Sequence, residues 1–380
     1  MRRKAAAFLM AALAACGPLS IAPARTADSR ASPPAAPAAP TAARCSPGAL
    51  RLVPLPLVPV AISASGEVLG LDEARRAVRW RGAGGGLEPL PVPDGFERAE
   101  PVALNGRGDI VAVAVAGAGA SERRRAYVVS GGRVIGLGGV GVRPFRIDDR
   151  GVIAGEAVLG TPGRSDPVIW HLQSAATARR STSGASRPIS KQSLATLPPS
   201  AAELTPHVLE NCCGGTAKLL DGAGGIAGDL YDAAGRYHAT RWRDGAQTQA
   251  LRSNDRYSSA LALNSHGSLV VVEFPRIWLL GSNGTERLTL AARAPSHPHA
   301  LNDCELLVGD YGPNADALRA FAWTRAGGFT DLNARVERPP GWTLKSAVDV
   351  NDRGEIVGRA ALPGDLERGF LLEPIEPSQN

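Results

Sequence analysis

The sequence predicts an all-β fold, a β-propeller of seven four-stranded blades, with six or eight blades as alternatives. Three observations predict it. A motif recurs seven times between residues 60 and 358, a short apolar run that often ends in Trp follows each copy, and most copies lie 38 to 49 residues apart. A repeat of about 40–45 residues is typical of a propeller blade.

The recurring motif combines an aliphatic residue, a Ser, Asn or Asp, a Gly three residues later, and a second aliphatic residue two positions after that. Glu305 replaces the Gly in the sixth copy. A short polar side chain followed by Gly at this spacing favours a type I turn, and aliphatic runs on both sides indicate a β-hairpin. The seven turn positions are Ser63, Asn105, Asp148, Asp221, Asn264, Asn302 and Asn351.

A third strand is expected after each hairpin. Aromatic and β-branched residues are enriched there, as they are in strands. A Gly-containing turn and a shorter apolar run follow at 130–137 and 325–332, which gives four strands in each repeat. Five of the six tryptophans occupy the third-strand slot: Trp80, Trp170, Trp242, Trp278 and Trp323.

One spacing is irregular, because 73 residues separate Asp148 from Asp221. This indicates an insertion at about 171–205, which is rich in Ser, Thr, Ala and Arg. Such a segment is typical of a disordered surface loop. The alternative is a lid or contact arm on one face of the ring, since long loops on rigid scaffolds often carry function.

The chain ends predict how the ring closes. Residues 51–58 are similar to 87–93, which occupy the fourth-strand slot of the first repeat, and the last repeat stops after its third strand. We therefore expect 51–58 to complete the last blade, which would protect its edge. Pro54, Pro56 and Pro59 fit only an edge or irregular strand, which is where this closure places them.

The first 15 residues predict a signal peptide that is not part of the fold. Arg2, Arg3 and Lys4 precede an apolar stretch over 5–15 that is too short to cross a bilayer. Leu-Ala-Ala-Cys at 13–16 resembles a bacterial lipobox, which implies cleavage before Cys16 and lipidation of its thiol. The alternative is an ordinary signal peptide with a chance Cys.

Residues 16–44 predict an Ala- and Pro-rich tether, because such a composition favours extended chain and buries no core. The propeller then occupies 45–380. Gly17 after the lipidated Cys resembles outer-membrane sorting. The expected location is the bacterial outer membrane, held by the lipid anchor alone, on the periplasmic side or exposed at the surface.

Charge and cysteine content limit the partners. Without Arg2, Arg3 and Lys4 the chain has 39 Lys and Arg against 36 Asp and Glu, so nucleic acid is not an expected partner. Export would allow disulfides to persist. Four cysteines allow three pairings, among which the sequence does not choose. They are Cys45, Cys212, Cys213 and Cys304.

No catalytic, cofactor or metal site is assigned. Cys212, Cys213 and Cys304 with His207, His297 and His299 are the alternative of a metal site, but their spacing matches no standard zinc pattern. The Gly-rich 136–141 has no following helix, as a dinucleotide site needs. The six histidines are scattered, although propeller enzymes gather residues from several blades.

The repeats resemble the HAF repeats of exported bacterial proteins, best in 319–333 and 341–374, although Arg319-Ala320-Phe321 replaces the His-Ala-Phe. The resemblance implies export and a β-propeller, and no activity. The expected function is a monomeric binding or scaffolding module for an envelope or surface protein or a polysaccharide. The alternative is an extracytoplasmic carbohydrate-active hydrolase or lyase, which histidines and carboxylates meeting at one channel mouth would favour.

Overall fold

The computed structural model describes residues 48–82, 84–160, 163–172, 203–211, 213–250, 257–273, 276–282, 287–289, 295–364 and 366–375. The chain divides into two units, Met1–Pro40 and Thr41–Asn380, and the described residues all belong to the second. The signal peptide, Cys16 and the tether therefore lie outside the described residues. Among the described residues, no helix is long and apolar enough to cross a membrane.

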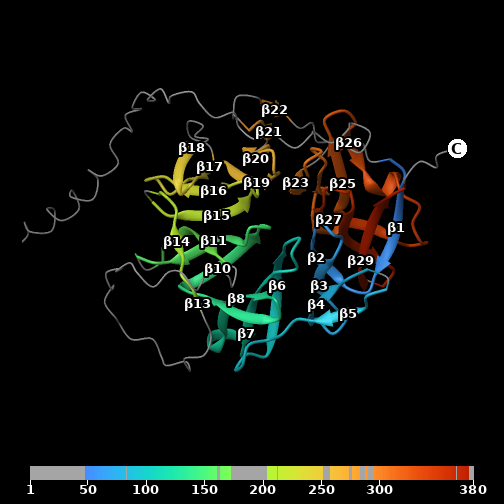
Figure 1. Ribbon diagram of the computed structural model, residues 1–380. Helices are drawn as coiled ribbons and strands as arrows, with labels where there is room; N and C mark the ends of the chain where they lie inside the picture. Colours follow the sequence, from blue (N-terminus) through green and yellow to red (C-terminus); the bar gives the residue numbers. More distant parts are fainter. Residues whose placement is uncertain are drawn as a thin grey trace, which may run out of the picture. The chain divides into compact units, whose positions relative to one another are not determined.

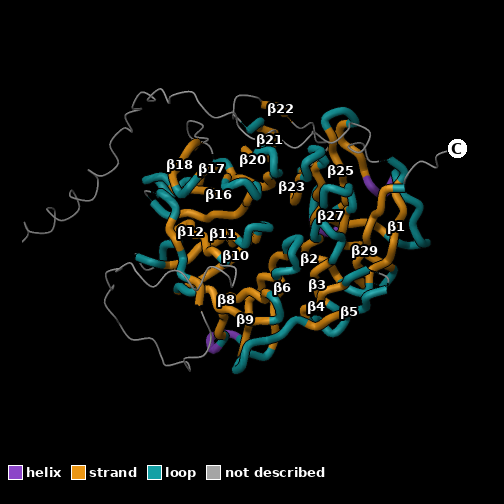
Figure 2. The backbone as a smooth tube through the Cα atoms, viewed as in Figure 1, coloured by secondary structure: helices purple, strands orange, loops and turns teal. Residues whose placement is uncertain are grey.

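The second unit is a seven-bladed β-propeller, as predicted (Figure 1). Seven small sheets stand in a ring, and the first strand of each blade contacts the first strands of its two neighbours. Strands account for nearly all of the regular structure in Figure 2, apart from the short 3₁₀ turns η2 (Gly119–Ser121), η3 (Ala315–Ala317) and η4 (Leu332–Ala334).

The strands of each blade follow from the inside of the ring outward. Blade 1 comprises β2 (Val58–Ile62), β3 (Val68–Leu71), β4 (Ala77–Trp80) and β5 (Leu87–Pro89); blade 2, β6 (Arg98–Leu104), β7 (Ile110–Ala116), β8 (Arg123–Ser130) and β9 (Arg133–Leu137); blade 3, β10 (Val140–Ile147), β11 (Val152–Val158), β12 (Asp166–His171) and β14 (His207–Val208); blade 4, β15 (Gly215–Leu220), β16 (Gly225–Tyr231), β17 (Tyr237–Arg243) and β18 (Ala246–Ala250); blade 5, β19 (Ser259–Leu263), β20 (Leu269–Glu273), β21 (Arg276–Leu280) and β22 (Arg287–Thr289); blade 6, β23 (Ser296–Leu301), β24 (Leu307–Tyr311), β25 (Arg319–Thr324) and β26 (Gly328–Asp331); blade 7, β27 (Thr343–Val350), β28 (Ile356–Leu362), β29 (Leu366–Pro374) and β1 (Leu50–Leu55).

The N-terminal strand closes the ring. β1 is the outermost strand of blade 7 and pairs antiparallel with β29, with Leu50 opposite Pro374. The predicted closure is confirmed, but its predicted extent over 51–58 was too long. The strand ends at Leu55, just before Pro56, which has no N–H to donate to a ladder. Val58 already begins the inner strand of blade 1.

The seven turn positions are all buried and make the same local contacts. In every copy the side-chain oxygen accepts a hydrogen bond from the backbone N–H four residues later. Glu305, which replaces Gly in one copy, keeps the turn by adopting a φ of +55°. We call the end of the ring that carries these turns the turn face.

The Asn copies also join neighbouring blades. The side-chain Nδ2 of Asn105, Asn264 and Asn302 donates to the backbone carbonyl of the next turn position, at 2.9, 3.2 and 2.9 Å. Asn351 donates to the carbonyl of Ser63 at 3.0 Å across the closure. Turn chemistry predicts only a local role for the seven positions, because it does not show a hydrogen bond to another blade.

Every inner strand contains a β-bulge at the same place, three residues before the turn position. The bulge brings a strand carbonyl close to the second strand. A Cβ added at Gly309 would lie 2.1 Å from the carbonyl oxygen of His297, so only Gly fits there. A bulge also changes the direction in which side chains point, which matters for the site below.

The end of the insertion binds to blade 2. Glu203 and Leu204 form β13, which adds a fifth strand parallel to β9. An ion pair of 2.7 Å between Arg125 and Glu203 holds this contact. The chain then returns to blade 3 as β14. Residues 173–202 of the predicted insertion lie outside the described residues, so the choice between a loop and a contact arm stays open for them.

Candidate functional site

The end of the ring opposite the turn face carries the turns between second and third strands and the connections between blades. We call it the loop face, and we call the contact between the inner strands of two adjacent blades a seam. Three of the seven seams hold a buried carboxylate near the loop face, on the second strand, eight residues after the turn position. These carboxylates belong to Glu156, Asp229 and Asp310.

In the seam between blades 6 and 7, three side chains are hydrogen-bonded to one carboxylate. His297 Nδ1 lies 2.9 Å from Asp310 Oδ1, and His299 Nε2 lies 2.7 Å from Asp310 Oδ2. Ser346 of blade 7 donates its hydroxyl to the same Oδ2 at 2.8 Å. Burial opposes the charge of Asp310, but the hydrogen bonds from His299, His297 and Ser346 outweigh it and lower the pKa to about 2.

The seam between blades 4 and 5 repeats this arrangement with a lysine. Lys218 stands at the bulge, where blade 6 has His299, and its Nζ pairs with Asp229 Oδ2. Ser259 of blade 5 donates to that oxygen at 2.7 Å, and the backbone N–H of Ala260 donates to Oδ1 at 2.9 Å. The negative charge of Asp229 is thus compensated by Lys218, and its hydrogen bonds connect blades 4 and 5.

The seam between blades 3 and 4 has the buried carboxylate but no basic side chain at the bulge position. Phe145 stands at the bulge, and Glu156 accepts one hydrogen bond of 3.2 Å from Arg143. Burial raises the pKa of Glu156, against the effect of Arg143. Thr216 occupies the position of Ser259 and Ser346, but its buried hydroxyl has no hydrogen-bond partner among the described residues.

These residues do not form a nucleophilic triad. Ser346 and both histidines donate toward one carboxylate, whereas an activated Ser must donate to a His that is held by the acid. Within the described part of the chain, no group of three or more His, Cys, Asp and Glu is arranged to hold a metal ion. His207, one of the six residues of the alternative metal site, packs edge-on against His171 in blade 3, with ring centroids 5.4 Å apart.

Three exposed tyrosines border the blade 4–5 seam on the loop face. Tyr231 and Tyr237 are paired across β16 and β17 and are 42% and 39% exposed. Tyr257, on the connection into blade 5, is 52% exposed, and its ring centroid lies 4.9 Å from that of Tyr237. Asp229 lies two residues before Tyr231 on β16, so both side chains project from the same side of the sheet.

An ion pair crosses the central channel. Arg146 of β10 lies 3.7 Å from Asp349 of β27, measured between Nη1 and Oδ2. These strands belong to blades 3 and 7, which are not neighbours in the ring. Asp349 is buried and also accepts a 3.0 Å hydrogen bond from the backbone N–H of Ile62. The channel is therefore polar at this level, and its two charges compensate each other.

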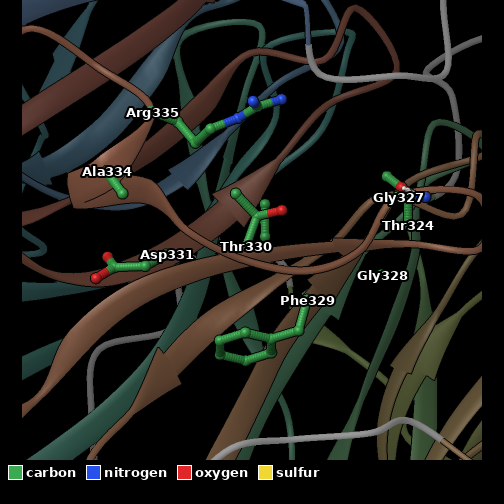
Figure 3. A pocket seen from close by; sticks show the side chains of 9 residues that line it. Thr324, Gly327, Gly328, Phe329, Thr330, Asp331, Ala334 and Arg335 are labelled. Atoms are coloured by element: carbon green, nitrogen blue, oxygen red, sulfur yellow. Dashed lines mark hydrogen bonds between the residues drawn. The ribbon is translucent and has the colours of Figure 1, made fainter.

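Two open grooves lie away from the seams. One, of about 300 Å³, is formed by β25, β26 and η4 of blade 6. Figure 3 shows Ala334 between Asp331 and Arg335, with Thr330 to the right of them and the ring of Phe329 below Thr330. Asp331 is the only carboxylate of this groove, and its Oδ1 already accepts from the backbone and side chain of Asn333. The groove thus offers no uncommitted acid for chemistry.

The second groove, of about 420 Å³, separates blades 1 and 2 and contains Arg79, Arg81 and Arg107. Arg79 and Arg81 pair with Glu88 at 2.7 and 3.0 Å, and Arg107 pairs with Asp109 at 2.7 Å. Its charges are compensated within the groove. The seams therefore offer the more distinctive chemistry, since they join carboxylates, hydroxyls and exposed rings.

The sequence-predicted residues lie apart from these seams. The seven turn positions are on the turn face and support the ring. Cys304 forms a disulfide bond, while Cys45 and Cys212 lie outside the described residues. The seam carboxylates were missed, although they share one offset from the turn position. Aligning the repeats on that offset would have found Glu156, Asp229 and Asp310.

Comparisons with known proteins give no family. No family model and no curated protein matches the chain. Among solved structures, a chain of the mitotic checkpoint complex is 11% identical, with 93% of this chain and 100% of that chain covered and a TM-score of 0.49.

Two other solved structures are similar at the same low level. YCF48 bound to D1 peptide is 10% identical, with coverage of 88% and 97% and a TM-score of 0.45. The acylaminoacyl peptidase of Pyrococcus horikoshii is 8% identical, with coverage of 85% and 52% and a TM-score of 0.49. No activity, ligand or partner is transferred from these structures.

Proposed function

We propose that this chain is an exported, lipid-anchored binding module of the HAF-repeat type, which presents its loop face to a component of the bacterial cell envelope. One observation carries the proposal: the two faces of the ring differ in what their side chains do. On the turn face, the polar side chains of the seven turn positions are used in hydrogen bonds to the backbone of their own turn or of the next blade. On the loop face, Tyr231, Tyr237 and Tyr257 are exposed beside compensated charges.

The chemistry of the loop face supports binding rather than covalent catalysis. Exposed tyrosines offer rigid rings and a polar tip, a combination that is common in binding surfaces. The hydroxyl and histidines near Asp310 all point to the carboxylate, so no nucleophile is activated there. The lipid anchor is inferred from the resemblance of residues 13–16 to a lipobox, and the expected location is the outer membrane.

Photo-crosslinking from the two faces tests the function. A photoreactive amino acid is placed at Ala234, which is exposed in the loop-face turn of blade 4, and separately at Ala64 on the turn face. We expect an envelope protein or polysaccharide to be captured from position 234 and not from 64. Equal capture from both positions, or none from either, would contradict the proposal.

The anchor is tested by Cys16→Ser. We expect the variant to leave the membrane fraction at low ionic strength, because burial of acyl chains supplies about 0.8 kcal/mol for each methylene. Retention of the variant in the membrane would exclude lipidation as the anchor. The Ala234 crosslink can be repeated on the released protein, which separates location from binding.

One observation favours a second candidate, a carbohydrate-active hydrolase. A general acid needs a raised pKa, and burial raises that of Glu156. Lys218, which pairs with Asp229, also acts electrostatically on Glu156, so two carboxyls of different character lie on either side of blade 4. Release of reducing ends from a polysaccharide, abolished by Glu156→Gln and by Asp229→Asn, would identify this activity.

A further inference from the structure

We propose that the seam between blades 4 and 5 is a binding site for a neutral, hydroxyl-rich saccharide. The proposal rests on the proposed function and names the ligand class of the same face. It assigns two parts to the site: a platform of Tyr231, Tyr237 and Tyr257, and a polar floor of Lys218, Asp229 and Ser259, which leads inward toward the channel.

The platform and the floor are continuous. The backbone N–H of Ser258 donates to the carbonyl of Tyr237 at 3.1 Å, and its hydroxyl accepts from the N–H of Ala239 at 3.0 Å. Ser258 therefore fixes Tyr257 on one side and Ser259 on the other. Ser259 in turn donates to Asp229, as described above. A short run of chain thus connects exposed rings to buried hydrogen-bonding groups.

The charges of this site are compensated. Lys218 pairs with Asp229 on the floor. In the turn beside the platform, Asp232 pairs with Arg236 at 2.9 Å and with His238 at 3.2 Å. Backbone hydrogen bonds, that of Arg236 first, and the bonds from the His238 and Arg236 side chains lower the pKa of Asp232, so it stays ionised. An anionic ligand would meet carboxylates, and a cationic one would meet Lys218 and Arg236.

A neutral saccharide fits this combination best. A pyranose ring has an apolar C–H face that packs on an aromatic ring, and hydroxyls at its edge that both donate and accept hydrogen bonds. Protein interfaces normally centre on a larger apolar patch. Here the three exposed tyrosines are the only large apolar side chains exposed on the described part of blades 4 and 5. The surface is therefore small and amphipathic, as one or two sugar rings require.

The test uses the full chain and a panel of neutral glycans of bacterial and plant origin, with sulfated and uronate oligosaccharides as charged probes. We expect saturable binding of at least one neutral glycan. Tyr257→Ala and Tyr237→Ala should each weaken it about tenfold, whereas Tyr257→Phe should retain it, since the ring makes the contact. Because these side chains are exposed, the unfolding midpoints should not move.

A matched control is Leu366→Ala, which removes an exposed apolar side chain of blade 7, 62% exposed, and should leave glycan affinity unchanged. Failure of every neutral glycan to bind, or preference for the charged probes, would overturn the proposal. Capture of a protein from position 234 together with absent glycan binding would remove this inference and leave the binding function standing.

Discussion

The seam between blades 3 and 4 and the seam between blades 6 and 7 share one backbone plan but give opposite electrostatics. Each has a bulge, a Gly beside the bulged strand and a buried carboxyl at the same offset. Burial raises the pKa of Glu156, whereas hydrogen bonds outweigh burial and hold that of Asp310 at about 2. The bulge side chain, Phe145 or His299, is the largest chemical difference between them.

The comparison shows that the position of a carboxyl in the repeat determines where it lies in the seam. The neighbouring side chains determine its pKa and the number of its hydrogen bonds. A carboxyl that receives three side-chain hydrogen bonds helps to hold two blades together. The carboxyl of Glu156 has one such bond, from Arg143 of its own blade, and the Thr216 hydroxyl of blade 4 has no partner among the described residues, so this carboxyl does less to join its two blades.

The largest expected effect comes from breaking what the two seams share. In Gly309→Ala, the new Cβ would lie 2.1 Å from the carbonyl oxygen of His297, so the bulged strand must move. We expect a loss of about 3 kcal/mol in the free energy of unfolding, measured by urea denaturation. Gly160→Ala is the matched control, because nothing lies within 4 Å of its Cβ position, and a similar loss there would contradict the explanation.

Removing each carboxylate charge should distinguish the seams. Asp310→Asn should cost about 2 kcal/mol at neutral pH, since it replaces charged hydrogen bonds by neutral ones and turns one acceptor into a donor. Glu156→Gln should cost little, because it removes a buried charge that burial already disfavours. Equal losses in urea denaturation at pH 7 would show that the seams are equivalent.

The pH dependence should differ in sign. The pKa of Asp310 is about 2 when folded and 3.8 for an unperturbed Asp, so its contribution, on the order of 2 kcal/mol, is complete above about pH 4 and is lost as pH falls toward 2. The difference in stability between the wild type and Asp310→Asn should therefore shrink over that range. For Glu156 the pKa is raised, so its contribution is present at low pH and falls as pH rises.

The smallest and most specific effect is expected from Phe145→Lys, which places a cation at the bulge as in blade 4. The ammonium should lower the pKa of Glu156, as measured by following its carboxyl carbon in an NMR titration. Phe145→Leu is the control for the loss of the ring and of its cation–π contact with Arg143. An unchanged pKa of Glu156 in the Lys variant would mean that the bulge side chain does not control this seam.

The sequence predicted the ring because its determinants are local. Turn chemistry at Asn351 and its six counterparts, and the Trp of the third strand, are readable within a few residues. The closure by β1 was also predicted, from similarity between 51–58 and 87–93, although its end at Leu55 depends on Pro56 and on pairing with β29.

The site was not predicted, because its contacts join residues far apart in the chain. Asp310 meets Ser346, 36 residues away, and Arg146 meets Asp349 across the channel. No local motif reports such pairs. The bulge decides where Lys218 and His299 point. The sequence of a single strand does not predict it, and it can be recognised only when all seven repeats are compared.

The position of β1 also determines the order in which the blades can be completed during folding. Blade 7 takes its outermost strand from the beginning of the chain and its other three from the end, with Arg51 bonded to Glu373 across 322 residues. A nascent chain can form blades 1 to 6 as they emerge, but the seventh must wait for the final strand. Ring closure is thus expected to come late in folding, because β1 can pair only after β29 has been synthesised.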